Sequence, residues 1–449
     1  MTSLFFKIKR QIKIWGVIFG LSVLWQGVIF ANETNFQAID DYLKMTPEAR
    51  QKIVQEYLSK PLTEETVLKL SFIQSPDLKA GFQELWARKS AYLGNVSIEN
   101  PVLGASVLPQ SQGSKIDISL EQDLLKLLIV PMQSRAADTQ FEADKLAFSE
   151  TLLEQCEKAK KALVGYQAIQ DIWNIQLDFT EAAKATFELT QKQFVAGNIS
   201  ELQLKTNEAE YQDALAAQHK TDLMVQESKL QLQDIMGLDP GQTEWTVTGS
   251  LSEALPQIPS PDEVDKLIET QRPDLASLRA RLDSEKNRLD ALEWQNKLGS
   301  LKAGIQYEQE FDGTKSIGPK IEFGIPLFNQ GQWASKEHKA VTAQLFALLE
   351  AHQRRAQYSS RKIIAQLHYH LLEIDRSKKV LIPTHQRVTE LTQQHYNYML
   401  VGVYTLIQAK QDELKARQEY VHHLEEFWMA WAELEKEVGG KIPSQGENQ

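Results

Sequence analysis

The chain has a single cysteine, Cys156, among 449 residues, so no disulfide can form within it. An excess of positive charge is also missing. The 49 Lys and Arg against 60 Asp and Glu give a formal net charge of −11, which argues against nucleic acid as a partner. The sequence contains no P-loop, GxSxG, HExxH or CxxC motif. We therefore expect neither an enzyme nor a cofactor.

Long apolar runs are scarce, and the one strong example lies near the N-terminus. Four basic residues within positions 7–13 precede the run GVIFGLSVLWQGVIFA, which ends at Ala31. This order is typical of a secretory signal peptide, so we expect residues 1–31 to be removed. The alternative is a retained membrane anchor, although the run is shorter than the roughly 20 residues that a spanning helix needs.

The rest of the chain contains an internal repeat, a feature that decides the architecture where it occurs. SPDLKAGFQELWARKS at Ser75 parallels RPDLASLRARLDSEK at Arg272. AGNISELQLKTNE at Ala196 parallels VGVYTLIQAKQDE at Val401, which aligns Gly197 with Gly402. Each half predicts a helix, two strands, a long helix, a glycine turn and a further helix.

The repeat divides the chain into segments. The segment between the halves is rich in Pro and Gly. These residues break helices, so we expect a linker there. We expect an N-terminal helical segment at 32–73, the first repeat at 74–237, the linker at 238–261, the second repeat at 262–440 and a tail at 441–449. The long helical pattern of the second repeat contains Pro383, where we expect a kink.

Four short segments alternate apolar and polar side chains, as half-buried strands do. We expect strands at about 99–108, 115–122, 302–311 and 317–328. Their lengths are close to the roughly 9–11 residues of a tilted transmembrane strand. One face would line a water-filled lumen and carries Lys302, Glu308, Glu310, Lys320 and Glu322. The other would face lipid and carries Ile305, Tyr307, Ile321, Phe323 and Ile325.

The alternative for these strands is a small soluble hairpin packed on a helix. In lipid, a sheet must close so that no edge is left unpaired. Four strands cannot close a barrel, whereas twelve can, so a trimer with four strands per chain is the simplest closed arrangement.

The order of these features resembles that of the TolC-like outer-membrane efflux proteins, the outer channels of tripartite pumps. The resemblance covers roughly residues 74–440 and rests on the repeat, on RPDL at Arg272 and on GPKIEFGIPLFNQGQ at Gly318. PLFNQGQ is similar to the branch that serves heavy-metal efflux. The implied fold is mainly α with a small transmembrane β part: a homotrimer whose 12-strand β-barrel continues into a long periplasmic α-helical barrel.

The resemblance also implies a function. The chain would be an outer-membrane exit duct of a Gram-negative bacterium that extends into the periplasm and conducts solutes passively, with metal ions as one candidate class. Its partners would be a periplasmic adaptor protein, an inner-membrane transporter and outer-membrane lipid. The alternative is a periplasmic or membrane-anchored coiled-coil protein with a structural or adaptor role.

Two further sets of positions follow from the resemblance. The glycine turns would form the tip that docks the adaptor, through Val195, Ala196, Gly197, Ile199, Val401, Gly402, Val403 and Thr405. Each glycine would supply a left-handed residue at a helix end. Acidic gate residues of the family correspond here to the neutral Gln408 and Gln411, so a gate would close by packing near Tyr404 or by hydrogen bonds from Gln408.

The histidines offer no metal-binding motif. His368 and His370 are two residues apart and His422 and His423 are adjacent, so the side chains of each pair diverge on a helix. Neither pair has the spacing of four residues that converges on zinc. We therefore expect solvated histidines and no metal site.

Overall fold

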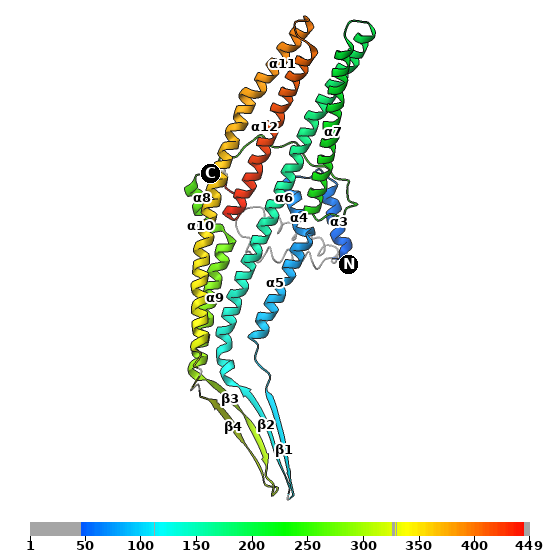
Figure 1. Ribbon diagram of the computed structural model, residues 1–449. Coiled ribbons are helices and arrows are strands. Elements are labelled where there is room, and N and C mark those ends of the chain that lie inside the picture. The colour runs from blue at the N-terminus through cyan, green and yellow to red at the C-terminus, as the bar shows by residue number, and fades with distance from the viewer. Residues whose placement is uncertain (1–45, 112, 326–327, 329, 444–449) are drawn as a thin grey trace, which may run out of the picture. The chain divides into compact units, whose positions relative to one another are not determined.

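The computed structural model describes residues 46–111, 113–325, 328 and 330–443, and it is mostly helical with one small sheet (Figure 1). The predicted signal peptide at 1–31 lies outside the described residues, as do 32–45 and 444–449. Among the described helices, none is both long and apolar enough to cross a membrane.

The elements follow the predicted repeat. The first half contains α3 (Pro47–Leu58), α4 (Glu64–Gln74), α5 (Pro76–Asn95), β1 (Val102–Gln110), β2 (Gly113–Asp123), α6 (Leu124–Val195) and α7 (Glu201–Ile235). The second half contains α8 (Pro261–Gln271), α9 (Pro273–Leu298), β3 (Ser300–Gln309), β4 (Lys315–Gly324), α10 (Gln332–Arg376), the π-helix η2 (Ser377–Leu381), α11 (Ile382–Asn397) and α12 (Val403–Val438).

Local sequence signals explain several helix starts. Thr63, Ser200 and Ser260 each cap a helix, accepting a hydrogen bond from the backbone N–H three residues later. In each case the side chain at that later position also accepts a hydrogen bond from the backbone N–H of the cap residue. Two otherwise unpaired backbone N–H groups are thus satisfied. The helices α4, α7 and α8 therefore begin where the sequence chemistry places them.

The sheet is antiparallel with the order β1-β2-β3-β4, and Figure 1 shows the strands in this order. The four predicted strands are present, and their ends lie within a few residues of the expected positions. β1 and β4 each have a partner strand on one side only. The described part of the chain thus leaves both edges of the sheet unpaired.

The long helix of the second repeat departs from α geometry just before Pro383. α10 ends at Arg376, and the wider π-helix η2 follows before Pro383 enters the first turn of α11. Proline lacks an N–H group and its ring clashes with the carbonyl four residues earlier. A π-turn at this point accommodates both defects.

The described chain forms two compact units, each of which draws on both repeats. Unit 1 comprises 46–79, 151–272 and 356–443, and unit 2 comprises 80–150 and 273–355. The core of unit 1 gathers buried side chains from α3, α4, α6 and α7 and from the segment after α7; it includes Val54, Leu62, Leu70, Leu163, Tyr166, Leu232, Met236 and Trp245.

In unit 2, α9 packs against α6 through small residues. The hydroxyl of Ser277 donates to the carbonyl of Ala143, and that of Ser284 donates to the carbonyl of Ala136, both at 2.8 Å. All four residues are buried. Each pair is spaced by seven residues, the repeat of a coiled-coil seam. Small side chains here let the two helices approach closely.

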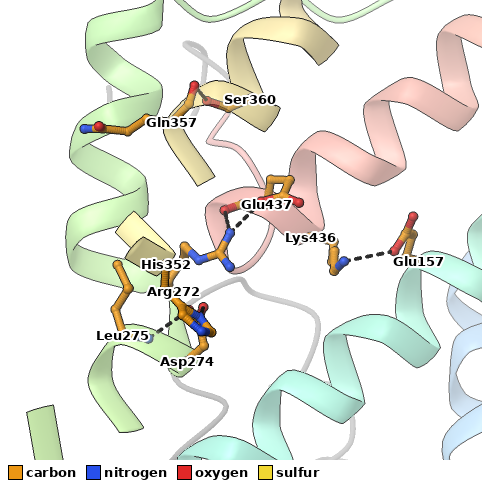
Figure 2. Close-up of polar contacts among 9 residues, drawn as sticks. All are labelled: Glu157, Arg272, Asp274, Leu275, His352, Gln357, Ser360, Lys436 and Glu437. Carbon is orange, nitrogen blue, oxygen red and sulfur yellow. Dashed lines mark hydrogen bonds and ion pairs between the residues drawn. The ribbon is translucent and has the colours of Figure 1, made fainter. Parts of the chain in front are cut away.

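The end of α12 is fixed within unit 1, as Figure 2 shows. Arg272 donates from Nη1 to the backbone carbonyl of Glu437 at 2.9 Å and to its carboxylate at 2.6 Å. Gly439 then ends the helix with φ +89°, and a Cβ there would lie 2.7 Å from the carbonyl oxygen of Gln271. Only glycine fits this position without a shift of the backbone.

Candidate functional site

The strand pairing of unit 2 gathers most of the charged side chains of the sheet on one face. We call this the charged face; it carries the predicted lumen residues Lys302, Glu308, Glu310, Lys320 and Glu322 together with Lys115, Asp117 and Glu121 from β2. Its residues neutralise one another across strands. Lys320 lies 2.7 Å from Glu121, and Lys302 lies 3.8 Å from Glu322.

The strand β2 completes this network. Lys115 pairs with both Glu308 and Glu310, the latter at 2.9 Å. Asp117 accepts a hydrogen bond from the side chain of Gln306 at 3.1 Å. The expected site omitted these β2 partners, because β2 and β3 are far apart in the sequence and pair only in the fold.

The opposite face of the sheet is apolar. We call it the apolar face; it carries Leu103, Val107, Ile118, Leu120, Ile305, Tyr307, Ile317, Ile321 and Phe323, and the exposed Ile325 follows directly after β4. Phe323 is 65% exposed, and most of the others are exposed as well. A contiguous apolar surface of this kind marks a contact with a membrane or with another protein.

The first tip turn joins α6 to α7 through a left-handed glycine. Gly197 has φ +77°, and its amide bonds to the carbonyl of Phe194 at 2.9 Å. The amide of Asn198 bonds to the carbonyl of Gln193 at 2.9 Å, which completes a Schellman motif. Ser200 then caps α7. The prediction for Gly197 is therefore confirmed in its conformation.

The second tip turn has the same hydrogen bonds but no glycine in the left-handed position. Met399 adopts φ +58°, and the amide of Leu400 bonds to the carbonyl of His395 at 2.9 Å. Gly402 has φ −79° and is the N-cap of α12. The prediction that Gly402 supplies the left-handed residue is wrong: Met399, three residues earlier, takes that role, and Gly402 stands where Ser200 stands in the first turn.

In Figure 1 both turns lie at the same end of unit 1. Several large side chains there are exposed: Val195 at 83%, Met399 at 93%, and also Leu202, Tyr398, Leu400 and Tyr404. Of the predicted docking residues, Ala196, Gly197, Gly402 and Thr405 are exposed, and Ile199 and Val401 are partly so. Val403 is 7% exposed, so it packs inside the helix pair and supports the turn.

The predicted gate positions make specific hydrogen bonds. Gln408 donates to Asp412 at 3.1 Å on its own helix, whereas Gln411 donates to Glu210 of α7 at 3.0 Å. Burial raises the pKa of Glu210, the nearby Asp213 raises it further, and the bond from Gln411 acts in the opposite direction. Gln411 thus links the two helical hairpins of unit 1.

A buried carboxylate strengthens the pair α11–α12 close to these positions. Glu413 is 8% exposed and binds Arg417 at 2.8 Å and Lys410 at 3.3 Å. Burial alone would raise the pKa of Glu413, but Arg417, Lys410 and a hydrogen bond with Thr389 of α11 outweigh it, so the pKa is lowered. Glu413 therefore stays ionised and holds both helices.

Two histidines that the sequence places far apart meet in unit 1. Nδ1 of His370 on α10 lies 3.3 Å from Nδ1 of His423 on α12. Spacing along one helix could not predict this pair, because each ring comes from a different helix. Across the part of the chain that the structure describes, no group of three or more His, Cys, Asp or Glu side chains is placed to hold a metal ion.

Comparisons with known proteins identify the fold. No family model matches the chain, and no curated protein matches its sequence. Among solved structures it is similar to the Campylobacter jejuni CmeC outer membrane channel, with a TM-score of 0.69, 15% identity, and 86% of this chain and 87% of that chain covered.

Two further channels give the same result. CusC, described for its transmembrane channel formation, matches with a TM-score of 0.69 and 15% identity over 84% of this chain and 92% of its own. The open state of the Neisseria gonorrhoeae MtrE outer membrane channel matches with a TM-score of 0.66 and 13% identity over 84% and 89%. These structural neighbours are outer membrane channels of the TolC family, and the mainly helical chain with a small four-strand sheet that the resemblance implies is the one observed.

Proposed function

We propose that the chain is a TolC-like outer-membrane channel, the exit duct of a tripartite efflux or secretion system. Three copies would close a 12-strand barrel in the outer membrane, and their helices would continue it into the periplasm. Solutes would pass down their gradient without chemistry. The single observation that carries the proposal is the sheet of unit 2, which is charged on one face, apolar and exposed on the other, and open at both edges.

The physics of the bilayer connects this sheet to a closed barrel. Every backbone N–H and C=O in lipid must be paired, because no water is present to satisfy it. β1 of one copy can pair with β4 of the next, which leaves no open edge once the ring closes. The apolar face would then meet lipid and the charged face would line the lumen.

The tip turns of unit 1 supply the docking surface in this proposal. Exposed apolar side chains such as Val195 and Met399 have few partners in the chain and suit a protein contact. The partner would be a periplasmic adaptor protein that connects the duct to an inner-membrane transporter. The sequence PLFNQGQ and the similarity to CusC favour a heavy-metal pump as the system served.

Fractionation and conductance test the proposal. The full chain, expressed with its own N-terminus in a Gram-negative host, should appear in the outer-membrane fraction as a trimer that dissociates on heating. The purified trimer should conduct ions when it is added to a planar lipid bilayer.

The coiled-coil alternative predicts the opposite results. A soluble periplasmic protein, or an inner-membrane protein that retains residues 1–31 as an anchor, would overturn the channel proposal. So would a trimer that inserts into no bilayer, because the exposed apolar face would then need another partner.

A further inference from the structure

We propose that His370 and His423 form a binding site for a divalent transition-metal ion of borderline softness, with Zn²⁺ as the reference ion. The site lies between α10 and α12 within unit 1. It does not depend on the proposed channel function, because it rests on side-chain geometry alone.

The distance between the two nitrogens fits a metal. Nδ1 of His370 and Nδ1 of His423 are 3.3 Å apart, and the ring centroids are 5.5 Å apart. Two imidazole nitrogens that each bind a tetrahedral zinc ion at ~2.0–2.1 Å are about 3.3–3.4 Å from one another. The observed spacing therefore matches that of two zinc ligands.

The protonation of the rings is also suitable. Burial is the largest cause that lowers the pKa of both His370 and His423. Neutral imidazole is the form that binds metal. Without a metal, one Nδ1–H donates to the other Nδ1. When a metal binds, that proton moves to Nε2 of the same ring, so no net proton is released.

The surroundings hold the rings in place. Tyr369 packs edge-on against both imidazoles, with ring centroids 5.0 Å from His370 and 5.9 Å from His423. The carboxylate of Glu426 raises the pKa of His370, and the carboxylates of Glu373 and Glu419 raise the pKa of His423. His422 lowers the pKa of both rings, and Arg376 lowers the pKa of His423.

The ligand set defines the ion and its exchange. Imidazole nitrogens suit zinc, nickel, cobalt and copper(II), whereas magnesium and calcium prefer oxygen ligands. Two protein ligands leave the remaining positions to water, as in an open site rather than a structural one. We therefore infer a site that loads and unloads, not one that the fold requires.

Metal titration of the purified full chain, with any affinity tag removed, tests this inference. Zn²⁺ is followed by calorimetry, and Co²⁺ serves as the spectroscopic probe. The wild-type chain should bind one ion of each, and Co²⁺ should give the visible absorption of a tetrahedral site. His370→Ala and His423→Ala should each weaken zinc binding by at least about tenfold, since even loss of a second-shell partner costs about 10–100-fold.

His368→Ala is the matched control. His368 lies two residues before His370 on the same helix and is exposed, so its loss should leave the affinity unchanged. Equal weakening by His368→Ala, or unchanged binding in the His370→Ala/His423→Ala double variant, would overturn the site. So would a wild-type chain that binds no zinc. Melting curves without metal show that each variant is folded, so a loss of binding is not a loss of structure.

Discussion

Single residues distinguish the two tip turns, although both have the same hydrogen bonds. Gly197 carries the left-handed backbone in the first turn, and Met399 carries it in the second. Left-handed backbone costs a residue with a Cβ roughly 1–2 kcal/mol, and glycine avoids this cost. Sequence reasoning selected Gly402 because glycine is the usual residue at such positions. It could not foresee a methionine there, since residues with a Cβ seldom adopt left-handed backbone.

This difference predicts unequal effects of the same substitution. Gly197→Ala should lower the free energy of unfolding by about 1 kcal/mol, because alanine is strained at φ +77°. Gly402→Ala should cost less, about 0.5 kcal/mol for the poorer N-cap, since φ is −79° and a Cβ there meets no atom within 4 Å. Denaturant unfolding followed by circular dichroism measures both. Equal losses would contradict the assignment of the turns.

Met399 also permits a clean test of docking. Asparagine tolerates left-handed backbone and is polar, so Met399→Asn should keep the turn while removing an apolar side chain that is 93% exposed. Under the proposed function, we expect binding of the periplasmic adaptor to weaken by about tenfold, or ~1.4 kcal/mol. Surface plasmon resonance with the purified adaptor measures this.

The control for docking is Met224→Gln, which changes another exposed methionine in the interior of α7. It should bind the adaptor as the wild type does. A similar loss in both variants, or no loss in Met399→Asn, would remove Met399 from the docking surface.

At the scale of elements, periodicity predicted most of the fold. Alternation located β1 to β4, and the repeated Pro-Asp-Leu located the starts of α5 and α9. The cross-strand partners and the His370–His423 pair were not predictable, because they join segments that are far apart in the sequence. The expected kink proved to be a π-turn, since one proline perturbs the turn before it.

Under the proposed function, the contact between α12 and α7 predicts how a helical pore would respond to substitution. Gln411→Ala removes the hydrogen bond to Glu210, a bond to a carboxylate worth about 1.5 kcal/mol, and should shift a closed–open balance about tenfold toward open. Single-channel recording in planar bilayers measures the open fraction. Gln408→Ala is the control, since the hydrogen bond that Gln408 donates goes to Asp412 of its own helix. A closed Gln411→Ala channel would exclude this contact from gating.

The pair α11–α12 should be sensitive to acid through Glu413. Its pKa is lowered in the fold, so the ionised carboxylate stabilises the protein above the ordinary carboxyl range, and this contribution is lost as the pH falls through the lowered value. Glu413→Gln should cost about 1.5–3 kcal/mol at pH 7 and much less at low pH. Unfolding curves at several pH values measure how the difference in the free energy of unfolding between wild type and variant decreases as the pH falls.

Glu419→Gln is the comparison for this effect, because Glu419 is exposed on the same helix. The free energy of unfolding of the Glu419→Gln variant should match that of the wild type at every pH. A Glu413→Gln deficit that does not depend on pH would show that packing, rather than charge, explains the role of this residue.

At the scale of the whole molecule, the two faces of the sheet should respond differently to one added charge. Phe323→Lys places a cation on the apolar face, and such a change costs about 2–4 kcal/mol near the bilayer midplane. Ser316→Lys adds the same side chain to the charged face of β4, opposite Glu308. Under the proposed function, only the first should reduce the amount of trimer in outer-membrane fractions. If Ser316→Lys reduced the amount of trimer and Phe323→Lys did not, the charged face would be the one that meets lipid.

The unpaired edges of the sheet affect how the number of channels depends on the amount of chain that the cell synthesises. A lone chain in lipid would leave the outer backbone groups of β1 and β4 unsatisfied, so under the proposed function insertion is coupled to association. By mass action, the yield of a three-chain assembly at low concentration rises with roughly the third power of the chain concentration. Halving synthesis would then leave about one eighth of the pores. The number of pores would therefore change more steeply than gene dosage.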